Sequence, residues 1–248
     1  MSDIFAADLH PGKTEVVARR LSARFGTELT AADLRMLTSF RFDDPAGEVG
    51  CETHIVAVTL PDAGEVVVQV PLTYRGAPLD EAPDEALVTT MDHSVLGERW
   101  VYEAAHDPVY VTELLLAITD ADGAAEQFLV EDDGSKSRIT EGLANVNGTG
   151  PGIDPSRAAV DADEAAGVEG ARSADPTLAA SLPEVGYAGD RTLISMRGTA
   201  LEVYDVLDLG SPSAEGEGVP GGWSVDAGQL VATWDGQKAP VTLARIVV

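Results

Sequence analysis

The chain of 248 residues has one cysteine, few basic residues and no long apolar run. Its single Cys51 cannot form an intramolecular disulfide, which argues against a disulfide-stabilised secreted protein. Residues 1–30 contain no apolar signal-peptide core, and the longest apolar run, residues 109–118, is interrupted by Thr112 and Glu113. That run is far shorter than the roughly 20 residues that a bilayer requires. We therefore expect a cytoplasmic protein with no membrane segment.

Basic side chains are also scarce. Against 16 Lys and Arg stand 42 Asp and Glu, so the formal net charge is −26. Nucleic acids and anionic membrane surfaces attract proteins of the opposite sign, so we expect neither as a partner. A basic protein partner, or solubility alone, fits this charge better. The apolar share of 44% is sufficient for a packed core.

The first 120 residues contain clear helix and strand patterns. Residues 13–25 place Val16, Val17, Leu21 and Phe25 on one helical face. Asp107 before Pro108 is typical of a helix start, and the residues that follow predict a second amphipathic helix. Between the helices, alternating apolar and polar residues predict strands, which are expected at about 37–42, 51–60, 65–72, 86–91 and 99–104.

The composition changes after about residue 130. Residues 134–186 are dominated by Gly, Ala, Pro, Ser and acidic residues, which predicts a flexible linker. Alternation then returns and predicts a small antiparallel unit, with strands expected at 191–196, 201–206, 223–225, 230–234 and 241–247. The domain prediction is 1–130, an α+β domain; 131–187, a linker; and 188–248, a β-unit that packs on the first domain. The fold class is α+β: a curved antiparallel sheet with an N-terminal and a second helix, plus a small C-terminal antiparallel β-unit.

Motifs that carry known chemistry are missing. The four histidines have no HxH or HxxxH spacing and the lone cysteine forms no CxxC, so we predict no metal site. The pairs Asp92-His93 and His106-Asp107 have no nucleophile on a GxSxG-like turn beside them. The glycine-rich residues 147–152 do not match a phosphate-binding loop. We therefore predict no catalytic residue and no cofactor.

One segment combines aromatic and polar groups. Trp100 and Tyr102 share a face of a predicted strand, which suits either a core face or an exposed platform for a sugar or a partner. Sugar sites combine such a platform with a few polar side chains. The candidate ligand or partner contacts are Arg75, His93, Trp100, Tyr102 and His106. For Trp234 and Trp223 in the C-terminal unit, anchoring that unit is the simplest role.

Three segments carry a family resemblance: FRFDDPAGEVGCE (40–52), VPLTYRGAPL (70–79) and DHSVLGERWVYEAAHDP (92–108). Their order and spacing are similar to those of small actinobacterial proteins classed as maltokinase N-terminal cap-like, some of them labelled 1,4-alpha-glucan branching protein. The resemblance covers roughly residues 1–120. It implies a curved antiparallel sheet with a helix, which in maltokinases is seated on the nucleotide-binding lobe of a kinase-like fold.

The family's catalytic residues have no counterpart in this chain. A kinase of that type needs an HxDxxxxN-like loop and a later Asp for the metal. His106-Asp107 is followed by Pro108-Val109-Tyr110 and no suitably placed Asn. The resemblance thus implies a non-catalytic cap-like module of α-glucan or trehalose metabolism that binds a kinase core or a trehalose- or glycogen-pathway enzyme. The alternatives are a sugar or small-molecule binder with weak transferase activity, and an inactive kinase remnant with a structural role.

Overall fold

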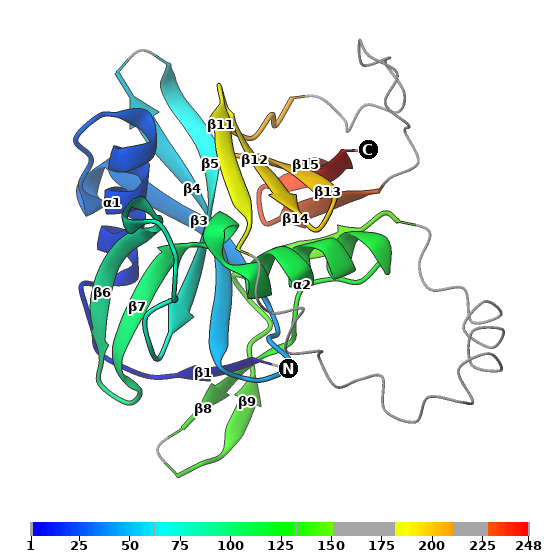
Figure 1. Cartoon of the computed structure of the whole chain (residues 1–248). Helices are drawn as coiled ribbons and strands as arrows, with labels where there is room; N and C mark the ends of the chain where they lie inside the picture. Colours follow the sequence, from blue (N-terminus) through cyan, green and yellow to red (C-terminus); the bar gives the residue numbers. More distant parts are fainter. Residues whose placement is uncertain (1, 62, 132, 151–181, 211–227, 248) are drawn as a thin grey trace, which may run out of the picture.

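The computed structural model describes residues 2–61, 63–131, 133–150, 182–210 and 228–247. Within these residues the fold is α+β, with two α-helices, a curled six-stranded sheet, a second six-stranded sheet and a small three-stranded sheet (Figure 1). The predicted fold class is therefore confirmed. The strand that was expected at 223–225, with Trp223, lies outside the described residues.

The first six-stranded sheet, here called the cap sheet, has the strand order β2-β6-β7-β5-β4-β3 and is antiparallel throughout. Its strands are β2 (Leu9–His10), β3 (Leu34–Phe42), β4 (Val49–Leu60), β5 (Gly64–Arg75), β6 (Leu87–His93) and β7 (Gly97–Glu103). All five strands predicted in this region are present. The long β4–β5 hairpin forms because β-branched residues flank a short turn that contains Pro61 and Gly64, and Gly64 has φ +72°.

Helix α1 (Lys13–Phe25) packs on the inner face of the cap sheet, as its apolar stripe predicts. Glu15 accepts a hydrogen bond from the backbone N–H of Gly12 at 2.8 Å and so closes the first turn. Because side chains alternate along a strand, every second residue points to this inner face, and part of that face is covered by the helix. The buried residues shared by helix and sheet are Val16, Val17, Leu21, Val56, Val58, Val68, Val70, Leu72, Met91 and Val101.

Helix α2 (Pro108–Thr119) begins where the sequence predicts. Asp107 is its N-cap and accepts the backbone N–H of Val109 at 3.0 Å, and Pro108 occupies the first turn. The helix packs on the outer face of the cap sheet, where Phe40, Phe42, Cys51 and Ile55 join the same core as Tyr110, Leu114 and Ile118. The tilted rings of Phe42 and Tyr110 are 6.0 Å apart.

The second six-stranded sheet, here called the C-terminal sheet, completes that core. Its order is β10-β14-β15-β13-β12-β11, all antiparallel, and α2 runs beside it (Figure 1). Its strands are β10 (Asn145–Gly148), β11 (Glu184–Ala188), β12 (Arg191–Met196), β13 (Thr199–Tyr204), β14 (Gln229–Trp234) and β15 (Gln237–Val247). The small sheet pairs β1 (Ser2–Phe5) with β8 (Gln127–Val130) in parallel, and β8 with β9 (Lys136–Arg138).

Three strands lie inside the segment that was expected to be a linker: β9, β10 and β11. They are short, and β9 and β10 are mostly polar, so their sequences carry little strand signal. Each forms because it pairs with a strand from another part of the fold or a neighbouring hairpin; β10, for instance, pairs with β14 over 80 positions away. Val146 is the one apolar residue of β10 and is buried. Residues 151–181 of the expected linker lie outside the described residues.

The two large sheets are joined along β5. The C-terminal half of β5 pairs with β7, but β7 ends at Glu103, which leaves residues 67–69 of β5 without a neighbouring strand on that side. Residues 205–207 cover this edge: Gln69 N–H donates to Asp205 O at 3.0 Å and Leu207 N–H donates to Val67 O at 2.8 Å. The side-chain amide of Gln69 also donates to Leu243 O and Tyr204 O of the C-terminal sheet. The C-terminal sheet thus packs directly on the cap sheet.

Candidate functional site

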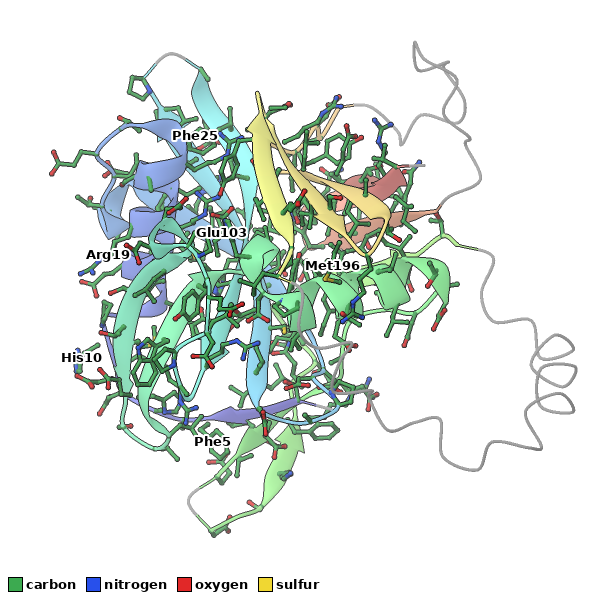
Figure 2. The ribbon with its side chains drawn as sticks, viewed as in Figure 1. Phe5, His10, Arg19, Phe25, Glu103 and Met196 are labelled. Carbon is green, nitrogen blue, oxygen red and sulfur yellow. The ribbon has the colours of Figure 1, made fainter. Side chains whose placement is uncertain are left out.

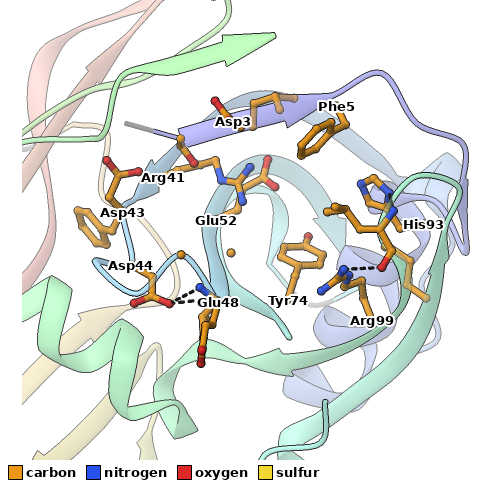
Figure 3. Close-up of a pocket in the computed structure, with 18 of the residues that line it drawn as sticks. Asp3, Phe5, Arg41, Asp43, Asp44, Glu48, Glu52, Tyr74, His93 and Arg99 are labelled. Carbon is orange, nitrogen blue, oxygen red and sulfur yellow. Dashed lines mark hydrogen bonds between the residues drawn. The ribbon is translucent and has the colours of Figure 1, made fainter. Parts of the chain in front are cut away.

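A cavity of about 480 Å³ opens at the end of the cap sheet that α1 does not fill. The N-terminal strand β1, the turn at 43–49, strands β4 and β5 and the turn between β6 and β7 surround it (Figure 3). Its volume is in the range of small-molecule sites. The labelled side chains in Figure 3 are mostly polar or charged, with Phe5 and Tyr74 as aromatic walls.

Strand alternation selects which side chains reach the cavity. Arg41 pairs in register with Glu52, and Tyr74 pairs with Val101, so these residues point to the inner face together with the core valines. Their neighbours Phe40 and Phe42 point to the outer core instead. The inner face of the cap sheet is therefore apolar beneath α1 and charged at the open end.

Three of the polar residues that line the cavity, Lys13, Glu52 and Tyr74, belong to one polar network. Lys13 Nζ, at the start of α1, donates to both carboxylate oxygens of Glu52 at 2.9 and 2.7 Å. His54 Nδ1 lies 3.9 Å from Glu52 Oε1, and His54 Nε2 lies 3.3 Å from the hydroxyl of Tyr74. Glu52 and His54 are both buried. A buried carboxylate needs such partners, because desolvation otherwise makes its charged form costly.

The protonation states in this polar network follow from the burial of its groups and from the charges that lie near them. Burial disfavours the Glu52 carboxylate, but its electrostatic interactions with His54, Lys13 and Arg41 and the hydrogen bond from Lys13 outweigh that effect and lower the pKa of Glu52 to about 2. Burial lowers the pKa of His54, Glu52 opposes this shift, and Lys13 and Arg41 add to it. At neutral pH this polar network therefore contains an ionised Glu52 beside a neutral His54.

Of the five candidates from the sequence, His93 lies at the cavity. Its Nδ1 accepts the backbone N–H groups of Val95 and Leu96 at 3.2 and 3.1 Å, which shapes the turn between β6 and β7. Its ring meets that of Phe5 edge-on, with the centroids 6.4 Å apart. Burial and the nearby charge of Arg99 lower the pKa of His93. His93 thus contributes a neutral ring to the rim.

Three other candidates lie on the opposite face of the cap sheet. Arg75 pairs with Trp100 in the β5–β7 register, and Tyr102 follows two residues later, so these side chains share the outer face. Arg75 makes two hydrogen bonds of 2.7 Å to the fully buried Asp107, which is the cap of α2. The buried Tyr102 hydroxyl accepts the N–H of Leu79 at 3.0 Å, and Trp100 is half-buried. These contacts give Arg75 and Tyr102 structural roles.

The fifth candidate, His106, lies where the two sheets meet. It belongs to the short 3-10 turn η3 (Ala104–His106), and its Nε2 is 3.9 Å from Glu103 Oε2 and 3.5 Å from the hydroxyl of Tyr187. Burial lowers its pKa most, while Glu103 opposes that shift. Arg20 of α1 pairs with the other oxygen of Glu103. Figure 2 places Glu103 between the cap sheet and the C-terminal sheet. The structure therefore does not bring the five candidates into one site.

Sequence reasoning did not select the side chains that do line the cavity, among them Lys13, Arg41, Glu52, Tyr74 and Arg99. A signal for Glu52 is present in the sequence. Glu52 and His54 occupy the same strand face as Val56 and Val58, which is an unusual place for a carboxylate unless it has a buried partner. The partner, Lys13, is 39 positions away, and only the tertiary structure shows it.

Most of the cap sheet, with the end of helix α1, matches a known protein family. Residues 22–107 match the family model of the maltokinase N-terminal cap domain. This segment is therefore similar to that domain and is here called the cap domain. The match begins inside α1, includes β3 to β7 and ends at Asp107, so the resemblance drawn from the sequence is confirmed for these residues. The search of curated proteins returned no match for the chain.

The cap domain and the remaining segments are packed together. The cap domain contributes β3 to β7 and residues 22–25 at the end of α1, whereas α2 and the C-terminal sheet lie beyond the matched residues. The cavity is formed mainly by the cap domain, with β1 and Lys13 added from the residues before it. Among the described residues, no helix has the length and apolar character needed to cross a membrane.

Proposed function

We propose that this chain is a non-catalytic cap module of α-glucan or trehalose metabolism, which acts by binding a protein partner such as a kinase core or an enzyme of the trehalose or glycogen pathway. The observation that carries the proposal is the family match over residues 22–107, which covers five of the six strands of the cap sheet, β3 to β7, and the end of α1. A domain of this family is named for its place at the N-terminus of a maltokinase, which favours a kinase core as its neighbour.

An open sheet edge supports the proposal by offering a surface for the partner. β3 is the edge strand of the cap sheet, and its second half is covered, since Ser39 O accepts the N–H of Ala144 and Thr38 Oγ1 donates to Gly142 O. Along residues 34–37, the backbone edge of β3 that faces away from β4 receives no hydrogen bond from another described segment. Met36 is exposed there. An edge of this kind pairs with an added strand from a partner, and apolar side chains then fill pockets between the two.

The charge of the chain supports the same class of function. A net charge of −26 accelerates encounter with a partner that carries a basic patch, and this acceleration weakens as salt screens the charges. The proposed setting is the cytoplasm, because the only cysteine, Cys51, is a free buried thiol, which fits a reducing compartment.

The test is affinity purification of the tagged full-length chain from the cytoplasm of its own organism, followed by mass spectrometry at low and moderate salt. We expect recovery of a sugar-kinase core or of an enzyme of α-glucan or trehalose metabolism, and less of it at moderate salt. Recovery of no carbohydrate enzyme at either salt concentration would overturn the proposal.

A further inference from the structure

Two arginines that line the cavity, Arg41 and Arg99, are in no direct ion pair with the residues that the structure describes. Most Lys and Arg side chains in the described part of the chain are in ion pairs, as expected in a protein with 42 acidic residues. Arg41 and Arg99 form no ion pair with any described residue, and the Nε of each is buried without a hydrogen-bond partner there. A buried guanidinium N–H without a partner is costly, so two of them in one cavity call for an explanation.

Glycines hold both guanidinium groups close to the backbone. A Cβ at position 50 would lie 2.7 Å from Arg41 Nη2, and a Cβ at position 76 would lie 2.9 Å from Arg99 Nη1. Any other residue at either position would therefore displace the arginine head. Arg99 also donates from Nη2 to the carbonyl of Leu96. Both guanidinium groups thus lie against a glycine, Arg41 on one side of Tyr74 and Arg99 on the other in the view of Figure 3.

The carboxylates around the cavity are largely engaged elsewhere. Glu52 is bound at both oxygens by Lys13, and Asp3 is bound at both oxygens by Lys136. Asp44 accepts the backbone N–H groups of Ala46, Glu48 and Val49 and thereby shapes the turn before β4. Glu48 is exposed and points away from the cavity in Figure 3. Arg41 and Arg99, apart from the Nη2 of Arg99 that binds Leu96 O, supply cationic N–H donors at this cavity that no described carboxylate binds.

We propose that this cavity binds a small organic molecule that carries a phosphate or another oxyanion, with Arg41 and Arg99 as the residues that bind the anionic group. Guanidinium groups suit this task because their N–H donors match the oxygens of phosphate and carboxylate. Phe5 and Tyr74 supply apolar walls for the uncharged part of the molecule. This site is independent of the partner surface at β3, so either can fail without the other.

The experiment is isothermal titration of the full-length protein with three probes: glucose 6-phosphate, inorganic phosphate and uncharged glucose. We expect glucose 6-phosphate to bind and glucose not to bind. Arg41→Met and Arg99→Met should each weaken binding of glucose 6-phosphate roughly tenfold or more, because each removes charge-assisted hydrogen bonds. Gly50→Ala should weaken it as well, since it moves Arg41 without changing the charge. Arg35→Met, which removes an exposed arginine on β3, is the matched control.

Thermal unfolding of each variant checks that it is folded. A measurement on the unmutated protein does not depend on the folding of any variant. In an NMR titration, the Nε–Hε resonances of Arg41 and Arg99 should shift on addition of glucose 6-phosphate and should not shift on addition of glucose. Equal affinity for inorganic phosphate and glucose 6-phosphate would support the oxyanion site and assign all of its affinity to the anion. Unchanged Nε–Hε resonances, an equal loss of affinity in Arg35→Met, or no binding of either phosphate at millimolar concentration would overturn the proposal.

Discussion

The hydroxyl of Tyr187, on β11, donates a hydrogen bond to Glu103 Oε2 at 2.7 Å, at the end of β7. The contact joins the edge strand of the C-terminal sheet to the last strand of the cap domain. Arg20 of α1 binds the other oxygen of Glu103, and the guanidinium of Arg24 lies 5.1 Å from the centre of the Tyr187 ring. Glu103 therefore connects the two sheets and helix α1.

Tyr187→Phe removes this hydrogen bond and keeps the ring. We expect the free energy of unfolding to fall by about 1.5–3 kcal/mol, because the acceptor is a buried carboxylate that is also paired with Arg20. Urea denaturation measures the change. Tyr204→Phe is the control, since the Tyr204 side chain contacts Arg191 and Arg245 through its ring. A fall of similar size in the control would contradict the role given to the Tyr187 hydroxyl.

The ion pair between Arg24 and Asp205 gives a second test of the contact between the sheets. Arg24 Nε lies 2.8 Å from Asp205 Oδ2, and both side chains are largely buried. Arg24→Met leaves Asp205 without its cation, and we expect a loss of about 3 kcal/mol. Adding Asp205→Asn should recover part of that loss, because the buried charge is then gone as well. Strictly additive losses in this double-mutant cycle would show that the two residues are not coupled.

Glu113 on α2 predicts a stability that depends on pH. Burial, with a smaller contribution from Asp44, raises the pKa of Glu113 to about 7. The folded protein thus holds a proton up to about pH 7 that the unfolded chain releases near pH 4.5, so stability falls as the pH rises between these values. Glu113→Gln removes this loss. It should be more stable than the unmutated protein at pH 8, by on the order of 1 kcal/mol after allowance for solvent screening, with a smaller difference at pH 5.

Thermal unfolding at both pH values measures the effect of Glu113→Gln. Glu141→Gln, at an exposed position, is its matched control. A stabilisation of equal size at pH 5 and pH 8 would show that Glu113 does not titrate in this range.

Glu52 predicts the opposite dependence at low pH. Its pKa in the folded protein is about 2, well below its ordinary value of 4.5. The stability that it contributes is therefore complete above about pH 4.5 and is lost as the pH falls toward 2. Lys13→Met should flatten this part of the profile, because it removes the cation bound to both carboxylate oxygens. Urea midpoints measured from pH 5 to pH 2.5 test this, and parallel profiles for the two proteins would count against it.

The fold was predictable wherever local pattern and burial agree. The apolar face of 13–25, the Asp107–Pro108 helix start and the β4–β5 hairpin are visible in the sequence because each depends on neighbouring residues. Strands β1, β9 and β10 were not predictable, since each has only three or four residues, and the pairing partners of β1 and β10 are remote in the sequence. A pattern of side chains does not show which backbone edges meet.

The cavity was less accessible to prediction than the fold. Trp100 and Tyr102 drew attention as an aromatic pair, but their face of the strand turns away from the cavity. Arg41 and Arg99 are isolated charges in separate strands, and only the curl of the cap sheet brings them to the same space. His93 was the candidate that the structure keeps there, through its position at the end of β6.

Binding of a protein partner through the open edge of β3 is tested most directly by comparing two variants of the protein, one altered at that edge and one altered elsewhere. Met36 on that edge is 37% exposed, and Leu193 on the C-terminal sheet is 38% exposed, so Met36→Glu and Leu193→Glu place the same charge at equally accessible positions. The tagged variants are purified from the native cytoplasm beside the unmutated chain. We predict that Met36→Glu loses the co-purified carbohydrate enzyme and Leu193→Glu keeps it. Equal recovery by all three proteins would contradict the account.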